Sequence, residues 1–325
     1  MQNSAQIEYD YSVAKCFTFT TILFGIIGMT IGVVLAFQLA FPELNYLAGE
    51  YGTFSRLRPL HTNGVAFGFT LSGVFAGWYY ISQRVLKVSL KESPFLMVVA
   101  KLHFWVYFIT ILLAVVTLFM GITTSKEYAE LEWPLDILVV VFWVLWGISV
   151  FGIIGIRRER TLYISIWYFI ATFIAVAMLY LFNNMEVPTA LVSGYGSWIH
   201  SVSMYAGTND AIIQWWYGHH AVAFVFTTPI IALIYYFLPK ESGQNIYSYK
   251  LSILAFWGLL FVYLWAGGHH LIYSTVPDWM QTMGSVMSVV LILPSWGSAI
   301  NMLLTMKGEW NQLQTNTLIK FMVLA

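Results

Sequence analysis

The chain has 325 residues, of which 59% are hydrophobic and only 9% are charged, with 15 basic and 15 acidic side chains. A soluble globular domain carries about 25% charged residues, so the composition indicates an integral protein of the lipid bilayer, and the zero net charge gives no reason to expect a nucleic-acid partner. A single cysteine, Cys16, excludes an internal disulfide and a site built from several thiolates.

The apolar runs are long and lack the alternation of a membrane β-barrel, so we expect an all-α, polytopic helical bundle. Windows of about 20 apolar residues predict eight complete spans, at residues 16–41, 62–83, 96–121, 135–156, 161–183, 209–238, 251–275 and 280–305. A ninth span begins near residue 317, and the chain ends inside it, so we expect a C-terminally truncated sequence. No repeat or linker interrupts this pattern, which favours a single domain over residues 1–325.

The lysines and arginines predict the orientation of these spans. Twelve of the fifteen fall on one side, and only Arg56, Arg58 and Lys126 fall on the other. The positive-inside rule makes the first side cytoplasmic and places the N-terminus there. The polar, acidic start of the chain also lacks the basic residues of a cleavable signal, so the first span is expected to remain in the mature protein.

Histidines recur at one depth of the predicted bundle. His219 and His220 lie about ten residues into the sixth span, and His269 and His270 lie eighteen residues into the seventh, which runs the opposite way. At about 1.5 Å per residue, both doublets fall in the outer half of the bilayer. His61 begins the second span at its outer end, so three helices bring imidazoles to one layer.

This histidine layer is typical of a metal site. A single histidine inside a membrane is often a packing residue, but two doublets at matching depth favour function. Neutral imidazole is the commonest metal ligand, and three imidazoles without cysteine or a nearby carboxylate suit copper, with zinc and iron as alternatives. His103 and His200 have no such neighbours in the sequence, so we interpret both as structural, or at most as residues that contact a metal ligand.

Three segments together resemble the catalytic subunit of haem–copper oxidases, namely RLRPLHTNGVAFGF (56–69), WWYGHHAVAF (215–224) and WAGGHHLIYSTVPDW (265–279). The resemblance is closest to cbb3-type cytochrome c oxidases and extends from residue 10 to 325. It implies a terminal respiratory oxidase of the bacterial inner membrane, which reduces dioxygen to water with electrons from cytochrome c and takes up or translocates protons. It further implies low-spin haem b, high-spin haem b3 and copper B as cofactors, and membrane-anchored monohaem and dihaem c-type cytochrome subunits as partners.

The resemblance also assigns roles to individual residues. His219, His269 and His270 match the three copper ligands, whereas His220 falls where the family motif does not require a histidine, and its role is left open. His61 matches an axial ligand of the low-spin haem b. Arg56 and Arg58 lie where the haem propionates of the family would sit, with a solvated loop pair as the alternative.

Tyr263 separates the family branches. In the aa3 branch a tyrosine follows the first copper histidine by four residues, and this chain has Ala223 there. The cbb3 branch takes its tyrosine from the next helix, six residues before the histidine pair, which is Tyr263. Because cleavage of dioxygen needs four electrons and iron with copper supply three at once, the phenol would give the fourth electron and a proton.

Two other functions remain as alternatives at this point. Nitric oxide reductases share the fold and the three histidines but carry glutamates near the first one, and the run WWYGHHAVAFVFTTP has no acidic residue. A transporter or scaffold in which the histidines relay protons or substrate would not need the spacing of Tyr263.

Further polar residues complete the expectations. Tyr235 and Ser252 match the proton path of the cbb3 branch, with aromatic anchoring at the membrane interface as the alternative. Ser274 and Thr275 are expected to pack against neighbours or to contact water. In the outer loop 124–133, carboxylates could bind a calcium ion or carry solvated charge; these are Glu127, Glu130 and Glu132. The family has twelve helices, and its tenth carries the histidines for haem b3 and for the second side of haem b. Both ligands would lie beyond residue 325, so we expect this fragment alone to be inactive.

Overall fold

The computed structural model describes residues 7–47 and 49–324 of the chain. Within these residues, eight helical stretches are long and apolar enough to cross a membrane, which confirms the predicted number of spans. They are Ser12–Ala40, Phe54–Val85, Pro94–Met120, Trp133–Gly155, Ile164–Asn183, Thr208–Ser242, Tyr249–Leu271 and Asp278–Thr305. Helix α15 (Thr317–Leu324) occupies the position of the predicted ninth span.

The chain groups into two compact units. The first comprises Met1–Thr161 with Tyr180–Ala206, and the second comprises Leu162–Leu179 with Gly207–Ala325. Helix α7 (Ile164–Asn183) therefore contributes residues to both units. The interpretation of residues 1–325 as a single domain stays a prediction.

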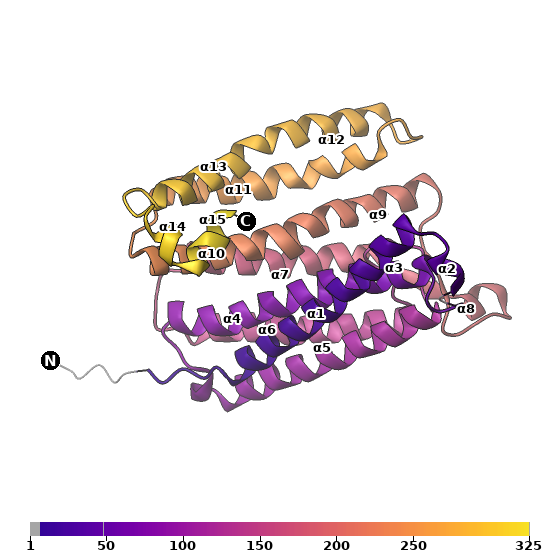
Figure 1. The fold of residues 1–325 in the computed structure, drawn as a ribbon, viewed down its shortest axis with the longest axis horizontal. Helices are drawn as coiled ribbons and strands as arrows, with labels where there is room; N and C mark the ends of the chain where they lie inside the picture. Colours follow the sequence, from indigo (N-terminus) through magenta and orange to yellow (C-terminus); the bar gives the residue numbers. More distant parts are fainter. Residues whose placement is uncertain (1–6, 48, 325) are drawn as a thin grey trace. The chain divides into compact units, whose positions relative to one another are not determined.

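The first unit is built from long helices that lie side by side in Figure 1. These are α1 (Ser12–Ala40), α3 (Phe54–Asn63), α4 (Leu71–Val85), α5 (Pro94–Met120) and α6 (Trp133–Gly155), with the short α2 (Leu44–Leu47) and the 3-10 turn η2 (Leu90–Glu92) between them. The core is aromatic, because Phe17, Phe75 and Trp146 are fully buried. His103 packs inside this cluster, with its ring centroid 4.4 Å from that of Phe75. Its place in the core agrees with the structural role predicted for it.

Two of the spans contain a π-helical segment that begins three residues after a histidine. The segment η1 (Gly64–Thr70) follows His61, and η3 (Val222–Thr227) follows His219. A π-helical turn inserts one extra residue and is frequent at functional sites. In η1 the carbonyl of Phe67 accepts a hydrogen bond from the Tyr107 hydroxyl at 2.6 Å, so a side chain of α5 satisfies the widened backbone.

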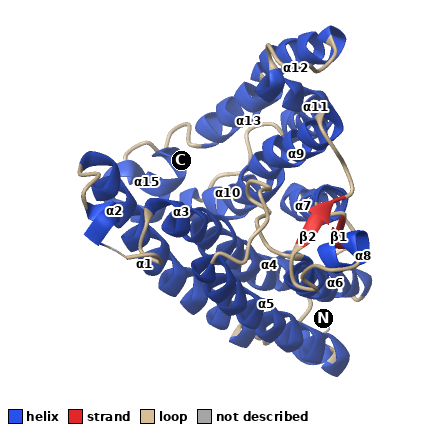
Figure 2. Cartoon of the chain, turned by 90° about the vertical axis from the view of Figure 1, so that its right-hand side faces the viewer, coloured by secondary structure: helices blue, strands red, loops and turns tan. Residues whose placement is uncertain are grey.

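The connection after α7 forms a small hairpin, drawn in red in Figure 2. Strands β1 (Glu186–Pro188) and β2 (Ser201–Ser203) pair antiparallel, and α8 (Thr189–Ser193) lies between them in the chain. The buried carboxylate of Glu132 fixes the hairpin to the start of α6, because it accepts hydrogen bonds from the backbone N–H of Ser201 at 2.9 Å and from His200 Nδ1 at 2.8 Å. His200 is thus a structural residue of this loop, as predicted.

The second unit contains the remaining long helices. These are α9 (Thr208–Ala221), α10 (Thr228–Ser242), α11 (Tyr249–Ala266), α12 (Asp278–Val290) and α13 (Ile292–Thr305), followed by α14 (Gln312–Thr315) and α15. Helix α11 continues as a 3-10 segment, η4 (Gly267–Leu271), so the span predicted to end at residue 275 stops four residues earlier. Ser248 caps the start of α11 by accepting a hydrogen bond from the Leu251 N–H at 3.2 Å.

Candidate functional site

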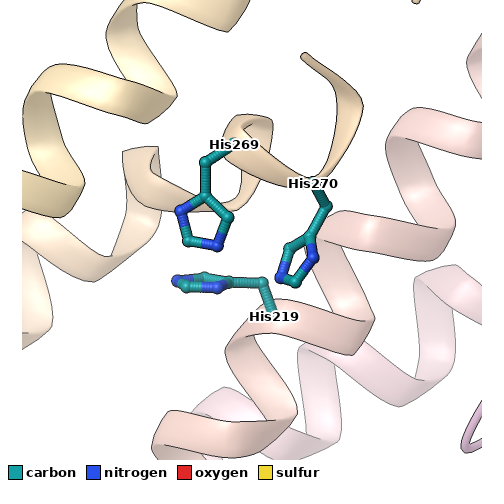
Figure 3. A group of neighbouring side chains, drawn as sticks. All are labelled: His219, His269 and His270. Atoms are coloured by element: carbon teal, nitrogen blue, oxygen red, sulfur yellow. The ribbon is translucent and has the colours of Figure 1, made fainter.

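Three imidazoles of the second unit point toward one another, as Figure 3 shows. His219 comes from the last turn of α9, and His269 and His270 come from η4. One ring nitrogen of each lies within 4.8 Å of the others. The ring centroids of His219 and His269 are 4.4 Å apart, and those of His269 and His270 are also 4.4 Å apart. The three histidines that the sequence singled out as metal ligands therefore converge.

Glycines allow the backbone of η4 to approach two neighbouring helices. A β-carbon at Gly267 would lie 3.1 Å from the carbonyl oxygen of Trp215 on α9. One at Gly268 would lie only 2.7 Å from the carbonyl oxygen of Met280 on α12, and one at Gly284 would lie 2.6 Å from the amide nitrogen of His269. The Gly-Gly pair before the histidines thus places η4 between α9 and α12 by backbone contact, which needs residues without a side chain.

Hydrogen bonding fixes which nitrogen of His269 is free. Its Nδ1 lies 2.5 Å from Ser288 Oγ, and Ser288 Oγ donates to the carbonyl of Gly284 at 2.6 Å. Since a hydroxyl has one proton to donate, Nδ1 must be the N–H partner of Ser288. This arrangement leaves the lone pair of Nε2 for a metal, as in other sites where a second hydrogen bond orients a ligating histidine.

The other two histidines are placed by ring contacts. His270 stacks on Trp215, with centroids 4.3 Å apart and an interplanar angle of 16°. His219 is buried, and its Nε2 has no hydrogen-bond partner among the described residues. A buried imidazole nitrogen without a partner fits a metal ligand. The donor set of three neutral imidazoles is suited to copper, with no carboxylate in the group.

Tyr263 lies against the first of these histidines. Its ring stacks on that of His219 at a centroid distance of 4.7 Å and an angle of 27°. The neighbouring His220 is fully buried and meets Tyr263 edge to face, at 5.9 Å. The structure therefore puts the tyrosine singled out by sequence spacing in direct contact with a candidate copper ligand.

His61 is oriented in the first unit by a separate hydrogen bond. Its Nδ1 lies 2.8 Å from the carbonyl oxygen of Gly28 on α1, so Nδ1 carries the proton and Nε2 remains available. Gly32, one turn further on α1, faces the ring so closely that a β-carbon there would lie 2.5 Å from His61 Cε1. The ring is thus held by α1 in one orientation and one tautomer, as an axial ligand would need.

The start of the second span differs from the prediction. The helix begins at Phe54 and not at residue 62, so His61 lies well inside it. Hydropathy missed residues 54–61 because Arg56 and Arg58 interrupt the apolar run, yet the helix accommodates both side chains. Arg56 Nη1 occupies the space beside Gly121, whose left-handed backbone has φ 75°, and Arg58 pairs with Glu127.

A buried polar cluster lies at the other end of α11. Asn301 of α13 donates from Nδ2 to Ser252 Oγ at 2.8 Å and approaches the Tyr235 hydroxyl at 3.4 Å. All three side chains are fully buried. Thr305 extends the cluster by donating to the carbonyl of Asn301 at 2.7 Å. The sequence indicated Tyr235 and Ser252 but missed Asn301, although an asparagine inside an apolar span is itself a signal of function.

A family model described as "Cytochrome C and Quinol oxidase polypeptide I" matches residues 12–325. The chain belongs to this family. This result confirms the resemblance to haem–copper oxidases and, with the eight apolar helices, identifies the chain as an integral membrane protein.

Similar proteins place the chain within this family. It is 43% identical over 325 residues to the cbb3-type cytochrome c oxidase subunit CcoN1 of Stutzerimonas stutzeri, covering 100% of this chain and 66% of that protein. It is 43% identical over 322 residues to cytochrome c oxidase subunit 1 of Rhodobacter capsulatus, covering 98% of this chain and 58% of that protein. The chain thus spans less than two thirds of these relatives' length. Both are named as oxidase subunits, and neither supports the nitric oxide reductase alternative.

A solved structure shares the fold. The cryo-EM structure of a haem–copper terminal oxidase dimer superposes with a TM-score of 0.67 at 18% identity, over 94% of this chain and 54% of that one. At this identity the likeness concerns the fold alone, which agrees with the predicted helical bundle.

The acidic loop before α6 is already paired within the protein. Glu127 pairs with Arg58, Glu130 accepts from Asn63 Nδ2 at 2.8 Å, and Glu132 binds the hairpin. Burial raises the pKa of Glu130, and the hydrogen bond from Asn63 opposes this shift. Among the residues that the structure describes, the histidine trio is the one group of metal-binding side chains that converges. These three glutamates do not form such a group, and calcium binding there stays a prediction.

Proposed function

We propose that the full-length protein is the catalytic subunit of a cbb3-type terminal respiratory oxidase, which reduces dioxygen to water with electrons from cytochrome c. The observation that carries this proposal is the convergence of His219, His269 and His270 with Tyr263 stacked on the first of them. The relative from Stutzerimonas stutzeri is named as a cbb3-type subunit, which supports the same branch.

The three imidazoles would hold copper B through the nitrogens that face one another. His269 contributes Nε2, because Ser288 engages its Nδ1. Bound copper would supply one-electron redox chemistry beside the oxygen-binding haem b3. The ligand of haem b3 would lie outside residues 1–325, as the resemblance implies.

Tyr263 would supply the fourth electron, and a proton, for the cleavage of dioxygen. Its phenol can release one electron and the proton of its hydroxyl together, and its stacked position on His219 keeps it beside the copper ligands. Stacking at 4.7 Å also restricts the ring to one orientation, so the hydroxyl is delivered to a fixed place.

Protons would enter from the end of α11 that carries Ser252. The hydroxyls of Ser252 and Tyr235 meet at Asn301 in a fully buried group, which can pass a proton along hydrogen bonds without exposing charge to lipid. Asn301 extends the path that the resemblance implies for Tyr235 and Ser252.

Electrons would enter through a low-spin haem b bound on one side by His61 Nε2, with Arg56 and Arg58 near its propionates. The donors would be membrane-anchored monohaem and dihaem c-type cytochrome subunits, which fits the naming of the relatives as subunits. The excess of basic residues on one side supports a bacterial inner-membrane location with a cytoplasmic N-terminus. A calcium ion near Glu127, Glu130 or Glu132 is part of the same proposal.

The test is oxygen uptake by membranes that carry the full-length protein, with nitric oxide turnover measured alongside. Tyr263→Phe should abolish oxygen uptake while haem and copper contents stay at the wild-type level. Tyr273→Phe is the matched control, because this tyrosine is fully exposed just after η4 and should keep full activity. A wild type that consumes nitric oxide and ignores oxygen would contradict the proposal, and undiminished uptake by Tyr263→Phe would remove Tyr263 from it.

A further inference from the structure

The loop that closes the β1–β2 hairpin carries large apolar side chains on its outside. This hairpin loop comprises residues 189–200 and includes α8, which lies beside the two strands in Figure 2. Tyr195 is 88% exposed and Trp198 is 61% exposed. Three aliphatic side chains are also more than half exposed, namely Leu191, Val192 and Ile199. No Lys, Arg, Asp or Glu occurs in residues 187–209. A contiguous apolar group of this kind marks an interaction surface.

The polar groups of the hairpin loop are bonded to one another. The N–H of Thr189 donates to the carbonyl of His200 at 2.8 Å, and the Thr189 hydroxyl donates to the carbonyl of Ser197 at 2.9 Å. The Ser197 hydroxyl in turn accepts from the N–H groups of Ile199 and His200, at 3.0 and 3.1 Å. Backbone that leaves water must satisfy its polar groups within the protein, and these hydrogen bonds meet that requirement for the groups they join.

The apolar surface of the hairpin loop continues the exposed face of α6, a helix of the same unit. The indole Nε1 of Trp133, the first residue of α6, donates to the carbonyl of Trp198 at 2.8 Å. From Trp133 onward the helix exposes apolar residues that recur every three to four positions, namely Ile137, Val140, Val141, Val144, Ile148 and Phe151. This spacing places them on one face of the helix. Because α6 is one of the eight apolar spans, this face is the one that meets lipid.

Trp133 also defines the depth of the hairpin loop. As the first residue of the span, it lies where the hydrocarbon gives way to the lipid headgroups, and the loop bonded to it lies at the same level. Glu132, one residue earlier, holds the end of the loop by accepting from the N–H of Ser201 at 2.9 Å. Tryptophan and tyrosine are enriched at this level, because each has an apolar ring and a polar N–H or O–H. Trp198 and Tyr195 are therefore the residue types that this depth favours.

We propose that the hairpin loop is a membrane-interface anchor, whose five exposed apolar side chains insert between phospholipids of the leaflet on the Trp133 side. Its occupant is lipid at the boundary between headgroups and acyl chains. A protein partner would have to follow the loop onto the α6 face, whereas lipid covers both surfaces without a break. Since the loop has no charged residue, insertion depends on apolar burial and needs no anionic lipid. The anchor fixes the depth of the Trp133 end of α6, and this role does not rest on the proposed oxidase activity.

The test is photo-crosslinking of the full-length protein in its assembled complex, held in nanodiscs of phosphatidylcholine. The photoreactive residue p-benzoyl-phenylalanine replaces Tyr195 or, separately, Leu191. Val144 in the middle of α6 is the control position for lipid contact, and Arg160 in the charged loop after α6 is the control position for water. All four positions are exposed, so the substitutions leave the packed core untouched. Mass spectrometry distinguishes a phospholipid adduct from a peptide adduct.

We expect positions 191 and 195 to give phospholipid adducts with a yield close to that of position 144. The yield at position 160 should be on the order of tenfold lower, because charged surroundings keep that residue in water. With the photoreactive residue at position 195, Leu191→Asp should lower the lipid yield about tenfold, since a carboxylate resists transfer into the bilayer. The neutral Leu191→Ala should keep most of the yield. Addition of phosphatidylglycerol should leave every yield unchanged.

Four results would overturn the proposal. Peptide adducts in place of lipid adducts at positions 191 and 195 would mean that a protein chain covers the hairpin loop. Yields no higher than that of position 160 would mean that the loop faces water. Adducts that form only with phosphatidylglycerol, or a full yield in Leu191→Asp, would mean that apolar insertion does not hold the loop. None of these measurements involves oxygen turnover or copper, so a failure of the proposed function would leave the anchor standing.

Discussion

Ser288 Oγ on α12 accepts a hydrogen bond from His269 Nδ1 at 2.5 Å and donates one to the carbonyl of Gly284 at 2.6 Å. The two hydrogen bonds run from His269 to Ser288 and from Ser288 to Gly284, because the hydroxyl can donate only once. A residue that no motif indicated thus decides which nitrogen of His269 faces the candidate metal position.

Ser288→Ala is expected to weaken copper binding about 10- to 100-fold, as is typical for the loss of a group that orients a ligating histidine. Without the hydroxyl, His269 can rotate or change tautomer. Copper per complex and its competition with a chelator would measure the effect. Ser285→Ala serves as the control on the same helix, since the Ser285 hydroxyl donates to the carbonyl of Gln281 one turn earlier and not to a histidine. Equal affinities in the two variants would mean that Ser288 does not orient the ligand.

Gly32→Ala is expected to abolish or strongly reduce low-spin haem b. The new methyl group would lie 2.5 Å from His61 Cε1, so the ring must leave its position or α1 must shift. Forcing extra volume into a packed site costs about 1–3 kcal/mol. Haem difference spectra would give the content of each haem. Gly73→Ala adds the same methyl group at an ordinary distance, 3.6 Å from Thr21 Cγ2, and should retain haem. Normal haem in Gly32→Ala would argue against His61 as the ligand.

Asn301→Leu should slow oxygen reduction at least tenfold, because it removes the amide that joins Ser252 and Tyr235. General acid–base and relay groups typically contribute about a hundredfold or more, and water can replace part of the link. Copper and haem contents should remain unchanged, since Asn301 belongs to a separate polar cluster at the start of α11. Steady-state uptake and proton uptake after a single reductive pulse would show the change. Ser295→Ala on the same helix is the control, and equal rates would exclude Asn301 from the path.

Glu130 should make stability depend on pH in a defined direction. Burial raises the pKa of this carboxyl above its ordinary value of 4.5, while the hydrogen bond from Asn63 opposes the shift. A carboxyl with a raised pKa in the folded state contributes stability that is fully present below the unfolded value. This contribution is lost as the pH rises through the folded value.

Glu130→Gln should therefore remove this loss of stability with rising pH. At pH values above the folded-state pKa of Glu130 it should be more stable than the wild type, because the amide oxygen still accepts from Asn63. Thermal unfolding of detergent-solubilised complex over a pH series, with a chelator present, would reveal the difference. The exposed Glu43→Gln should follow the wild type. Parallel curves for Glu130→Gln and the wild type would show that burial does not govern this group.

Hydropathy predicted all eight spans because lipid exposure demands apolar residues over their whole length. It failed at the start of α3, where the charged Arg56 fits into the space beside Gly121 and Arg58 pairs with Glu127. It also overran the end of α11, since Ile272 and Tyr273 are as apolar as helix residues and give no sign of a 3-10 ending.

The candidate ligands could be predicted because imidazoles are rare inside membranes and recur at one depth. Ser288 and Gly284 could not, since serine and glycine are common in spans and their importance appears only when α12 meets η4. The same holds for Gly32, whose sequence neighbours say nothing about His61. Residues that hold a ligand come from other helices, and their spacing in the chain carries no pattern.

The π-helical segments after His61 and His219 have a consequence for register. Each inserts one residue into the helix, and one residue corresponds to about 100° of rotation. Deleting a single residue from Val222–Thr227 would give a straighter helix with better backbone pairing. It would also turn the whole of α10 about its own axis relative to His219, so that Tyr235 would face away from Asn301. The π-helical segment therefore lets one continuous span present His219 to the candidate metal position and Tyr235 to the buried cluster of Ser252 and Asn301.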